Sequence, residues 1–164
     1  MEDQCFSSVD ATFSLKLSAE HLNNMLAICK KARSTETGGI LIGYYTETHD
    51  CAVVTKVLGP PSDSRASRAT FFRGVAGLTR RLRKLWERPH HYYLGEWHFH
   101  PYTASEPSGI DHKQMLEIAW STTYHCPEPV LIVLGGDPNG TFSLSVRVFP
   151  KTAPPVHLKA EERT

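Results

Sequence analysis

The stretch His98–Asp111, with the sequence HFHPYTASEPSGID, carries most of the information about the fold and its chemistry. Side chains two residues apart on a β-strand point to the same face, so His98 and His100 project together while Phe99 points to the opposite face. Pro101 cannot donate a hydrogen bond to a neighbouring strand and helps to end the strand after the second histidine. The stretch therefore predicts a strand that ends with two imidazoles on one face.

Asp111 follows at the start of a predicted helix. The segment SGID has the S-x-x-D form of a capping box, with Ser108 as the N-cap, and capping alone would explain both residues. A carboxylate in the first helical turn is also favoured by the helix dipole and can face a metal. Two histidines and one carboxylate leave the fourth position of a zinc ion to water, whose pKa falls to about 7. We therefore predict a hydrolytic metal site held by His98, His100 and Asp111.

A hydrolytic site of this kind also needs a base. Glu36, in the upstream stretch ETGGILIG, lies just before a predicted strand and could take a proton from the water and return it to a leaving amine. Glu96 lies on the same strand face as His98 and is the competing candidate. The residues alone leave this choice open.

The composition is that of one ordinary globular domain. The chain has 164 residues, of which 40% are apolar, and 18 lysines and arginines stand against 17 aspartates and glutamates. This balance does not point to nucleic acid or a membrane surface. No apolar run is long enough to span a bilayer, and the N-terminus does not resemble a secretion signal. Four cysteines without C-x-x-C spacing predict reduced thiols in a cytoplasm.

Hydrophobic periodicity predicts helices at residues 18–33, 74–87 and 109–121, the second of them ended by Pro89. Strands are predicted at residues 38–45, 52–58, 91–100, 130–134 and 141–149, the first two forming a pair. The basic face Arg80–Lys84 of the second helix could bind nucleic acid or an acidic protein patch, but a solvated face is the favoured interpretation. We expect one domain over residues 1–150, followed by a disordered tail over 151–164.

Glu36 in ETGGILIG, His98-x-His100-Pro101 and a helix-capping S-x-x-D motif that ends in Asp111 together resemble the JAMM (MPN-plus, JAB) family of zinc isopeptidases. The resemblance extends over most of the chain, from the first helix to the last predicted strand. It implies a single-domain α/β fold of the JAB/MPN type, related to cytidine deaminases, with a mixed β-sheet flanked by helices.

The same resemblance implies the roles of the site residues. One zinc ion would be held by His98, His100 and Asp111, and Glu36 would act as general base and acid. Ser108 matches the family serine that helps to stabilise the oxyanion of the tetrahedral intermediate. Every position of the motif is filled, which implies the catalytic branch of the family.

The stretch GEWHFHP, the short length and the opening ETGGILIGYY look like the bacterial JAB peptidases of CBASS antiphage operons. There, a ubiquitination-like enzyme attaches the C-terminus of a cyclic-oligonucleotide synthase to target proteins, and the peptidase removes it. The resemblance thus implies a protein substrate with an extended C-terminal tail, ubiquitin-like or a conjugated synthase. We expect neither a nucleic-acid nor a membrane partner, and the sequence leaves the oligomeric state open.

Two other functions remain open from the sequence. One is a peptidase that matures a sulfur-carrier or ubiquitin-like protein, and the other is a JAB module that binds a conjugate without cutting it. For a peptidase, an extended tail would be added to an exposed strand edge. The turn-rich segment 58–72 is the candidate flap that lines this groove.

Overall fold

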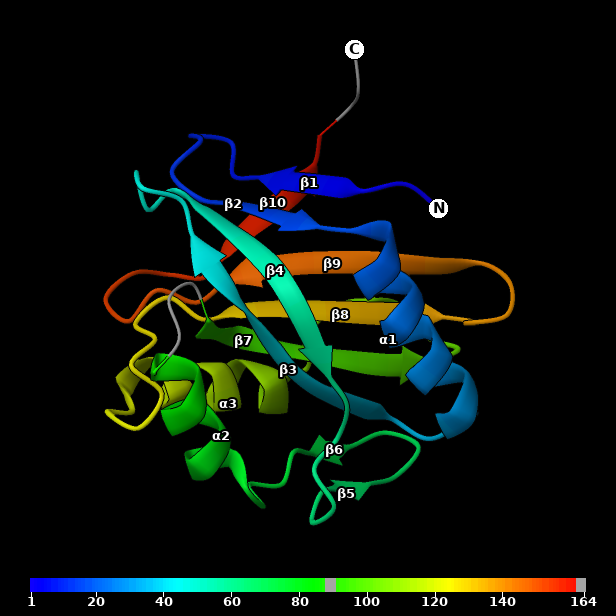
Figure 1. Cartoon of the computed structure of the whole chain (residues 1–164). Coiled ribbons are helices and arrows are strands. Elements are labelled where there is room, and N and C mark those ends of the chain that lie inside the picture. The colour runs from blue at the N-terminus through cyan, green and yellow to red at the C-terminus, as the bar shows by residue number, and fades with distance from the viewer. Residues whose placement is uncertain (88–90, 162–164) are drawn as a thin grey trace.

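The described part of the chain, residues 1–87 and 91–161 of a computed structural model, combines strands and helices in one domain (Figure 1). The strands are β1 (Gln4–Ser7), β2 (Ser14–Leu17), β3 (Thr37–Tyr45), β4 (Cys51–Leu58), β5 (Arg65–Ala66), β6 (Phe71–Phe72), β7 (Tyr92–Pro101), β8 (Val130–Gly136), β9 (Phe142–Val148) and β10 (Val156–Ala160). The helices are α1 (Ala19–Ala32), α2 (Leu78–Trp86) and α3 (Gly109–Trp120). The predicted α/β class with a mixed sheet is confirmed.

Strand β7, which carries the two predicted histidine ligands, lies between β3 and β8 in a closed sheet with the order β1-β10-β9-β8-β7-β3-β4-β2. It runs antiparallel to β3 and parallel to β8. The strands β5 and β6 form a separate small hairpin below the main sheet in the view of Figure 1. Since β7 has a neighbour on each side, its backbone is fixed along nearly its whole length.

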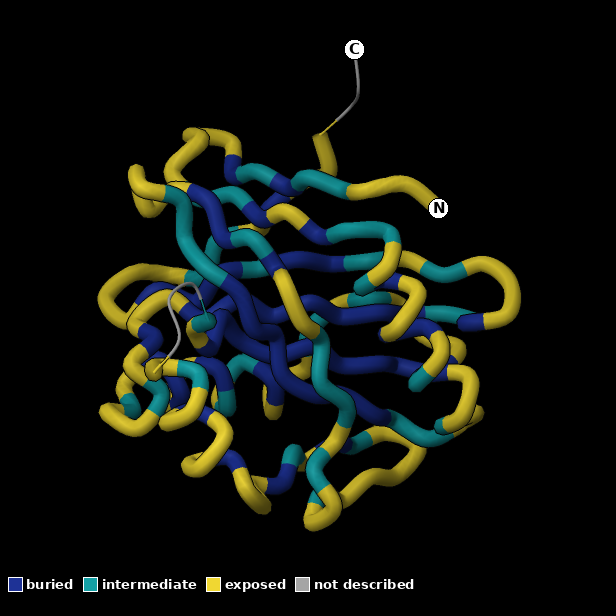
Figure 2. The backbone as a smooth tube through the Cα atoms, in the orientation of Figure 1, coloured by how far each residue is buried: buried dark blue, intermediate teal, exposed yellow. Residues whose placement is uncertain are grey.

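Apolar clusters cover both faces of the sheet. Helix α1 packs Met25 against the face that carries Trp97 and Phe99 of β7. On the opposite face, Leu82 of α2 and Met115 of α3 belong to a second cluster. Figure 2 shows that the central strands are buried while the connecting turns are exposed. The predicted parity of β7 is therefore confirmed, because Trp97 and Phe99 point away from the histidines and into the core.

A bulge at Gly95 sets which other side chains share the histidine face. The backbone of Gly95 has φ 149°, and a Cβ there would lie 1.8 Å from the carbonyl oxygen of Val130. Glycine is the residue that adopts such a conformation readily. The register against β3 shifts at the same point. As a result Tyr93 and Glu96, three residues apart, lie on one face of the sheet and contact each other.

Most predicted elements are present with small shifts of their ends. Helix α1 has the predicted N-cap, Ser18, whose hydroxyl accepts a hydrogen bond from the backbone of His21. Helix α2 is shorter than the predicted 74–87, because its first residues form a loop in which the Asp63 carboxylate accepts hydrogen bonds from the backbone N–H groups of Val75 and Ala76. Pro89, expected to end this helix, lies outside the described residues.

The disordered tail predicted for residues 151–164 is wrong for Val156–Ala160. This segment is strand β10, which pairs antiparallel with β9 on one side and β1 on the other. Strands β1 and β2 were not predicted either. Each of these strands has only four or five residues, so its local sequence carries little period-two signal. Pairing between the two ends of the chain stabilises them instead, and the domain extends past residue 150.

Candidate active site

The two histidines and the aspartate predicted as metal ligands converge. His98 and His100 project from β7 toward Asp111 in the first turn of α3. His98 Nδ1 lies 2.6 Å from Asp111 Oδ1, and His100 Nε2 lies 3.4 Å from Asp111 Oδ2. Their exposed fractions are only 1%, 7% and 4%. Asp111, eleven positions or more after the two histidines in the chain, thus joins them in one buried polar cluster.

Ser108 caps helix α3 and holds the Asp111 side chain. The Ser108 hydroxyl accepts a hydrogen bond from the Asp111 backbone at 3.2 Å, and the Ser108 backbone N–H donates to Asp111 Oδ2 at 2.6 Å. Helix capping and a ligand role for Asp111 are therefore compatible, because the complete capping box leaves the Asp111 carboxylate facing the histidines. The cap fixes the carboxylate relative to the end of β7.

The ionisation of this cluster follows from its hydrogen bonds. Burial disfavours the charged imidazole of His98, but the hydrogen bonds and charges of Asp111 and Glu96 outweigh burial and raise its pKa to about 9. Burial also opposes the charge on Asp111, but hydrogen bonds from His100 and His98 prevail and hold the pKa of that carboxyl below its ordinary value. These shifts favour a charged Asp111 carboxylate next to a charged His98 imidazole.

The donor set fits a metal ion in its chemistry. Two imidazoles and one carboxylate are ligands that catalytic zinc sites use, and they leave a position for water. Within the described ranges, no group of three or more His, Cys, Asp or Glu side chains is arranged as a ready metal cage. Asp111 instead contacts both histidines, through a hydrogen bond with His98 and an ion pair with His100.

Glu36 lies beside this cluster. The pairing of β3 with β7 places Thr37 opposite Phe99, so that Glu36, the preceding residue, comes next to His100. The Glu36 backbone N–H donates to the Ser67 carbonyl at 2.8 Å, which fixes the chain where β3 begins. Burial raises the pKa of the half-buried Glu36 carboxyl, His100 opposes this rise, and Asp111 adds to it. The predicted base candidate is thus close enough to interact with the predicted ligands.

Glu96, the competing base candidate, is enclosed by protein groups. Its carboxylate contacts the Arg73 Nε at 2.5 Å, the Tyr93 hydroxyl at 3.2 Å and His98 Nε2 at 3.3 Å. Burial favours a neutral carboxyl, but the hydrogen bond from His98 and the charge of Arg73 outweigh it and lower the pKa of Glu96. The shared strand face with His98 is confirmed, but the arrangement is that of a supporting group.

Sequence patterns do not indicate a role for Arg73. It follows β6 directly and lies 23 residues before Glu96 in the chain. No local sequence pattern predicts the ion pair between Arg73 and Glu96, because it depends on how the β5–β6 hairpin folds against β7. The same hairpin brings Phe71 edge-on to the His98 ring, with the ring centroids 5.3 Å apart. The segment predicted as a flap therefore contacts the candidate site.

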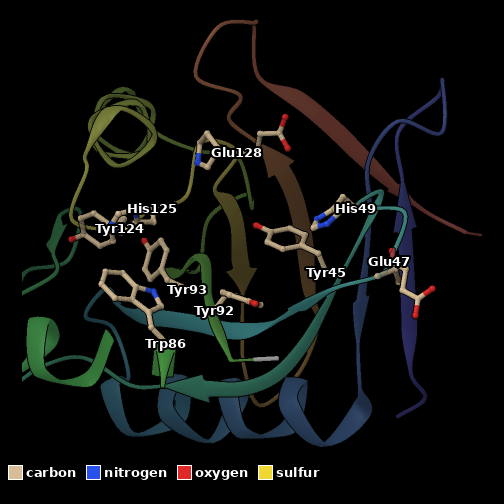
Figure 3. Close-up of a pocket in the computed structure, with 11 residues that line it drawn as sticks. Tyr45, Glu47, His49, Trp86, Tyr92, Tyr93, Tyr124, His125 and Glu128 are labelled. Atoms are coloured by element: carbon tan, nitrogen blue, oxygen red, sulfur yellow. The ribbon is translucent and has the colours of Figure 1, made fainter. Parts of the chain in front are cut away.

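An aromatic cavity of about 720 Å³ lies at the opposite end of β7 from the histidines (Figure 3). Its lining includes Tyr45, Trp86, Tyr92, Tyr93, Tyr124 and His125. Two of these residues connect it to the candidate site, because the Tyr93 hydroxyl donates to Glu96 and the Tyr124 hydroxyl accepts from Arg73. Sequence patterns did not indicate this cavity, because its walls come from separate segments.

Two further expectations concern thiols and membranes. All four cysteines are free thiols, as predicted from their spacing. Among the described residues, no helix combines the length and the apolar character needed to cross a bilayer.

This chain is similar in sequence to prokaryotic JAB-domain proteins. The model of the family Prok-JAB, prokaryotic homologues of the JAB domain, matches residues 18–147. A CD-NTase/cGAS isopeptidase of Enterobacter hormaechei subsp. hoffmannii is 45% identical over 97% of this chain and 88% of its own length. A probable metalloprotease of Sinorhizobium fredii is 31% identical over 70% of this chain and 71% of its own length.

A second CD-NTase/cGAS isopeptidase, from Escherichia coli, is 31% identical over 63% of each protein. The solution structure of a Desulfitobacterium hafniense protein covers 90% of this chain and 88% of its own, with a TM-score of 0.60 and 18% identity, a likeness in fold alone. The family match and the long, similar relatives agree with the fold. This chain belongs to the Prok-JAB family, the prokaryotic branch of the JAB-domain proteins.

Proposed function

We propose that this chain is a zinc-dependent JAMM-type isopeptidase that cleaves the bond after the C-terminus of a conjugated CD-NTase or a ubiquitin-like modifier. The observation that carries the proposal is the convergence of His98, His100 and Asp111, with Glu36 beside them through the register of β3 and β7. The relative that is 45% identical and named a CD-NTase/cGAS isopeptidase supports the same substrate class. The biological setting would be the reversal of protein conjugation in bacterial antiphage defence.

In this proposal His98, His100 and Asp111 hold the metal. When bound, the ion would supply Lewis acidity to the scissile carbonyl and acidify a water molecule at neutral pH. Burial of the ligands keeps bulk water from competing for them. The capping box adds rigidity, because it ties Asp111 to the start of α3.

Glu36 would move the protons. Its raised pKa makes the carboxylate a better base than an exposed glutamate, so it can accept a proton from the attacking water and keep it until the amine departs. The same group then donates that proton to the leaving lysine amine. Ser108 would stabilise the oxyanion, because its oxygen accepts from the Asp111 backbone while its own O–H remains available to donate.

The β5–β6 hairpin would guide the substrate tail. It lies against the site through Phe71 and Arg73, and Phe72 on it is 48% exposed. An extended C-terminal tail can add as a strand to such an exposed edge, with backbone hydrogen bonds holding the scissile bond in place. We assign this hairpin as the flap of the proposed groove.

The proposal is tested with defined conjugates. A CD-NTase joined through its C-terminus to a lysine of a second protein is incubated with the enzyme, with a chelator, and with the chelator followed by zinc. Cleavage that the chelator abolishes and zinc restores is the expected result. A linear fusion at the same C-terminus separates isopeptidase activity from maturation of a precursor. Binding of the conjugate without cleavage under all conditions would instead identify a non-catalytic module.

The proposed setting is the bacterial cytoplasm, where conjugating enzymes act and where the free cysteines would remain reduced. The partner is a protein with an extended C-terminal tail. Neither nucleic acid nor a membrane has a role in the mechanism.

A further inference from the structure

We infer that Glu96, held by Arg73, is a positioning residue that orients His98 as a metal ligand, an inference that rests on the proposed metal site. The key contact is between Glu96 Oε2 and His98 Nε2, which are 3.3 Å apart. The other ring nitrogen, Nδ1, faces Asp111. The His98 ring thus lies between two carboxylates, Glu96 at one ring nitrogen and the proposed ligand Asp111 at the other.

Each oxygen of Glu96 has a distinct set of contacts. Oε1 accepts from Arg73 Nε at 2.5 Å and from the Tyr93 hydroxyl at 3.2 Å. Oε2 is left to face His98. Since Glu96 is 1% exposed, water cannot replace any of these partners. The carboxylate therefore has a fixed rotation, and that rotation aims one oxygen at the histidine ring.

Arg73 is itself held at each end of its guanidinium. Nη1 donates to the Gly74 carbonyl at 2.8 Å, and Nη2 donates to the Tyr124 hydroxyl at 2.5 Å. Its charged carbon lies 5.6 Å from the centroid of the Tyr124 ring. Tyr93 and Tyr124 lie side by side in Figure 3, with ring centroids 4.7 Å apart. The rigid planar fork of arginine suits this triple contact, which a lysine could not reproduce.

A carboxylate behind a ligand histidine has a specific effect. It accepts the N–H of one ring nitrogen, which fixes the tautomer, so that the lone pair of the other nitrogen is directed to the metal. It also fixes the plane of the ring. In this chain the acceptor is Glu96, and the nitrogen left for the metal is the one that faces Asp111.

The arrangement separates the two glutamates near the site. Both oxygens of Glu96 contact protein donors, and Oε2 faces His98 Nε2, which is not the ring nitrogen that faces Asp111. Glu36 is half-buried at the start of β3 and comes next to His100. Glu96 therefore acts through His98, and it does not transfer the proton of the reaction.

The test compares metal affinity among variants. Glu96→Gln keeps the shape but removes the charge, and Arg73→Lys keeps the charge but loses the planar fork. Glu106→Gln is the matched control, because Glu106 also contacts an arginine, Arg147, at 2.5 Å but is 66% exposed on its side chain. Zinc affinity is measured by competition with a chromophoric chelator. The visible spectrum of the cobalt-loaded protein reports the ligand geometry directly.

The inference predicts zinc binding weakened by about 10- to 100-fold in Glu96→Gln, with a shifted cobalt spectrum. Arg73→Lys should weaken zinc binding and shift the cobalt spectrum in the same direction as Glu96→Gln, but to a smaller extent. Glu106→Gln should match the wild type. A folded Glu96→Gln or Arg73→Lys protein with wild-type affinity and spectrum would overturn it. If Glu96→Gln does not fold, the same measurements are made on Arg73→Lys and Tyr93→Phe. Weakened zinc binding in these variants supports the inference, and wild-type zinc affinity in both overturns it.

These outcomes are separable from the proposed function. If the wild-type protein binds no zinc, the proposed metal site fails, whatever the variants do. If the wild type binds zinc and cleaves the conjugate while Glu96→Gln binds zinc equally well, only the role of Glu96 fails.

Discussion

His98 Nδ1 lies 2.6 Å from Asp111 Oδ1, although the two residues belong to different elements, β7 and α3. This contact predicts how metal binding depends on pH. A metal must displace the proton shared in the pair, and the pKa of His98 is raised to about 9. Zinc affinity should therefore increase as the pH rises from about 6.5 toward 9, beyond the range expected for an ordinary histidine. Zinc titrations across this range check it; an affinity that levels off near pH 6.5 contradicts it.

The same pair predicts the stability of the metal-free protein. The folded-state pKa of His98 lies above the unfolded value of about 6.5, so its contribution is fully present below that pH. The contribution is lost as the pH rises through about 9. In urea unfolding of chelator-treated protein, the free energy of unfolding should therefore decrease as the pH is raised from about 6.5 to about 9. The zinc-loaded protein should show no such fall, because its bound histidine carries no titrating proton there.

Glu36→Gln should retain the metal but lose cleavage. The substitution removes the carboxylate that transfers the proton, and loss of a general base typically lowers kcat by about a hundredfold to ten-thousandfold. Zinc content and kcat are measured on the same preparation. Glu117→Gln, at an exposed position of α3, is the control with the same chemical change. Wild-type turnover by Glu36→Gln would remove Glu36 from the mechanism.

Ser108→Ala tests whether this residue does more than cap a helix. Loss of an N-cap should lower the free energy of unfolding by about 1 kcal/mol. Loss of an oxyanion donor should also lower kcat by about a hundredfold or more. Ser18→Ala is the matched control, because Ser18 caps α1 with the same 3.2 Å hydrogen bond to a backbone N–H. If both variants lose stability equally and neither loses kcat, Ser108 is a cap alone.

Phe72→Ser should weaken substrate binding without affecting the metal. Phe72 is 48% exposed on β6, where the proposed tail would bind. The variant should show a higher KM with little change in kcat or zinc content, because its side chain does not belong to the ligand cluster. Val9→Ser, at a residue that is 89% exposed beside β1, is the control for removing surface apolar area. Loss of zinc from Phe72→Ser would show that the hairpin supports the site instead.

Local patterns predicted the elements that build the site. Alternation along a strand placed His98 and His100 on one face and Trp97 on the other, and the capping box placed Asp111 at a helix start. These features depend on residues within about four positions of each other, where backbone geometry alone sets side-chain direction. The family resemblance then joined Glu36 to them, and the strand register agrees with it.

Long-range contacts could not be predicted in the same way. Strand β10 has the short sequence VHLKA and is stabilised by pairing with the preceding strand β9 and with β1 at the other end of the chain. The role of Glu96 depends on Arg73, which reaches it only because the β5–β6 hairpin packs against β7. Strand parity put Glu96 on the histidine face, but only the tertiary contacts distinguish a supporting carboxylate from a base.

The most direct test of the account is the metal content of active enzyme beside that of Asp111→Asn. The account predicts about one zinc ion per chain in the wild type, cleavage that follows the zinc content, and loss of both in the variant. Full cleavage by protein without any metal, or by Asp111→Asn without zinc, would contradict it.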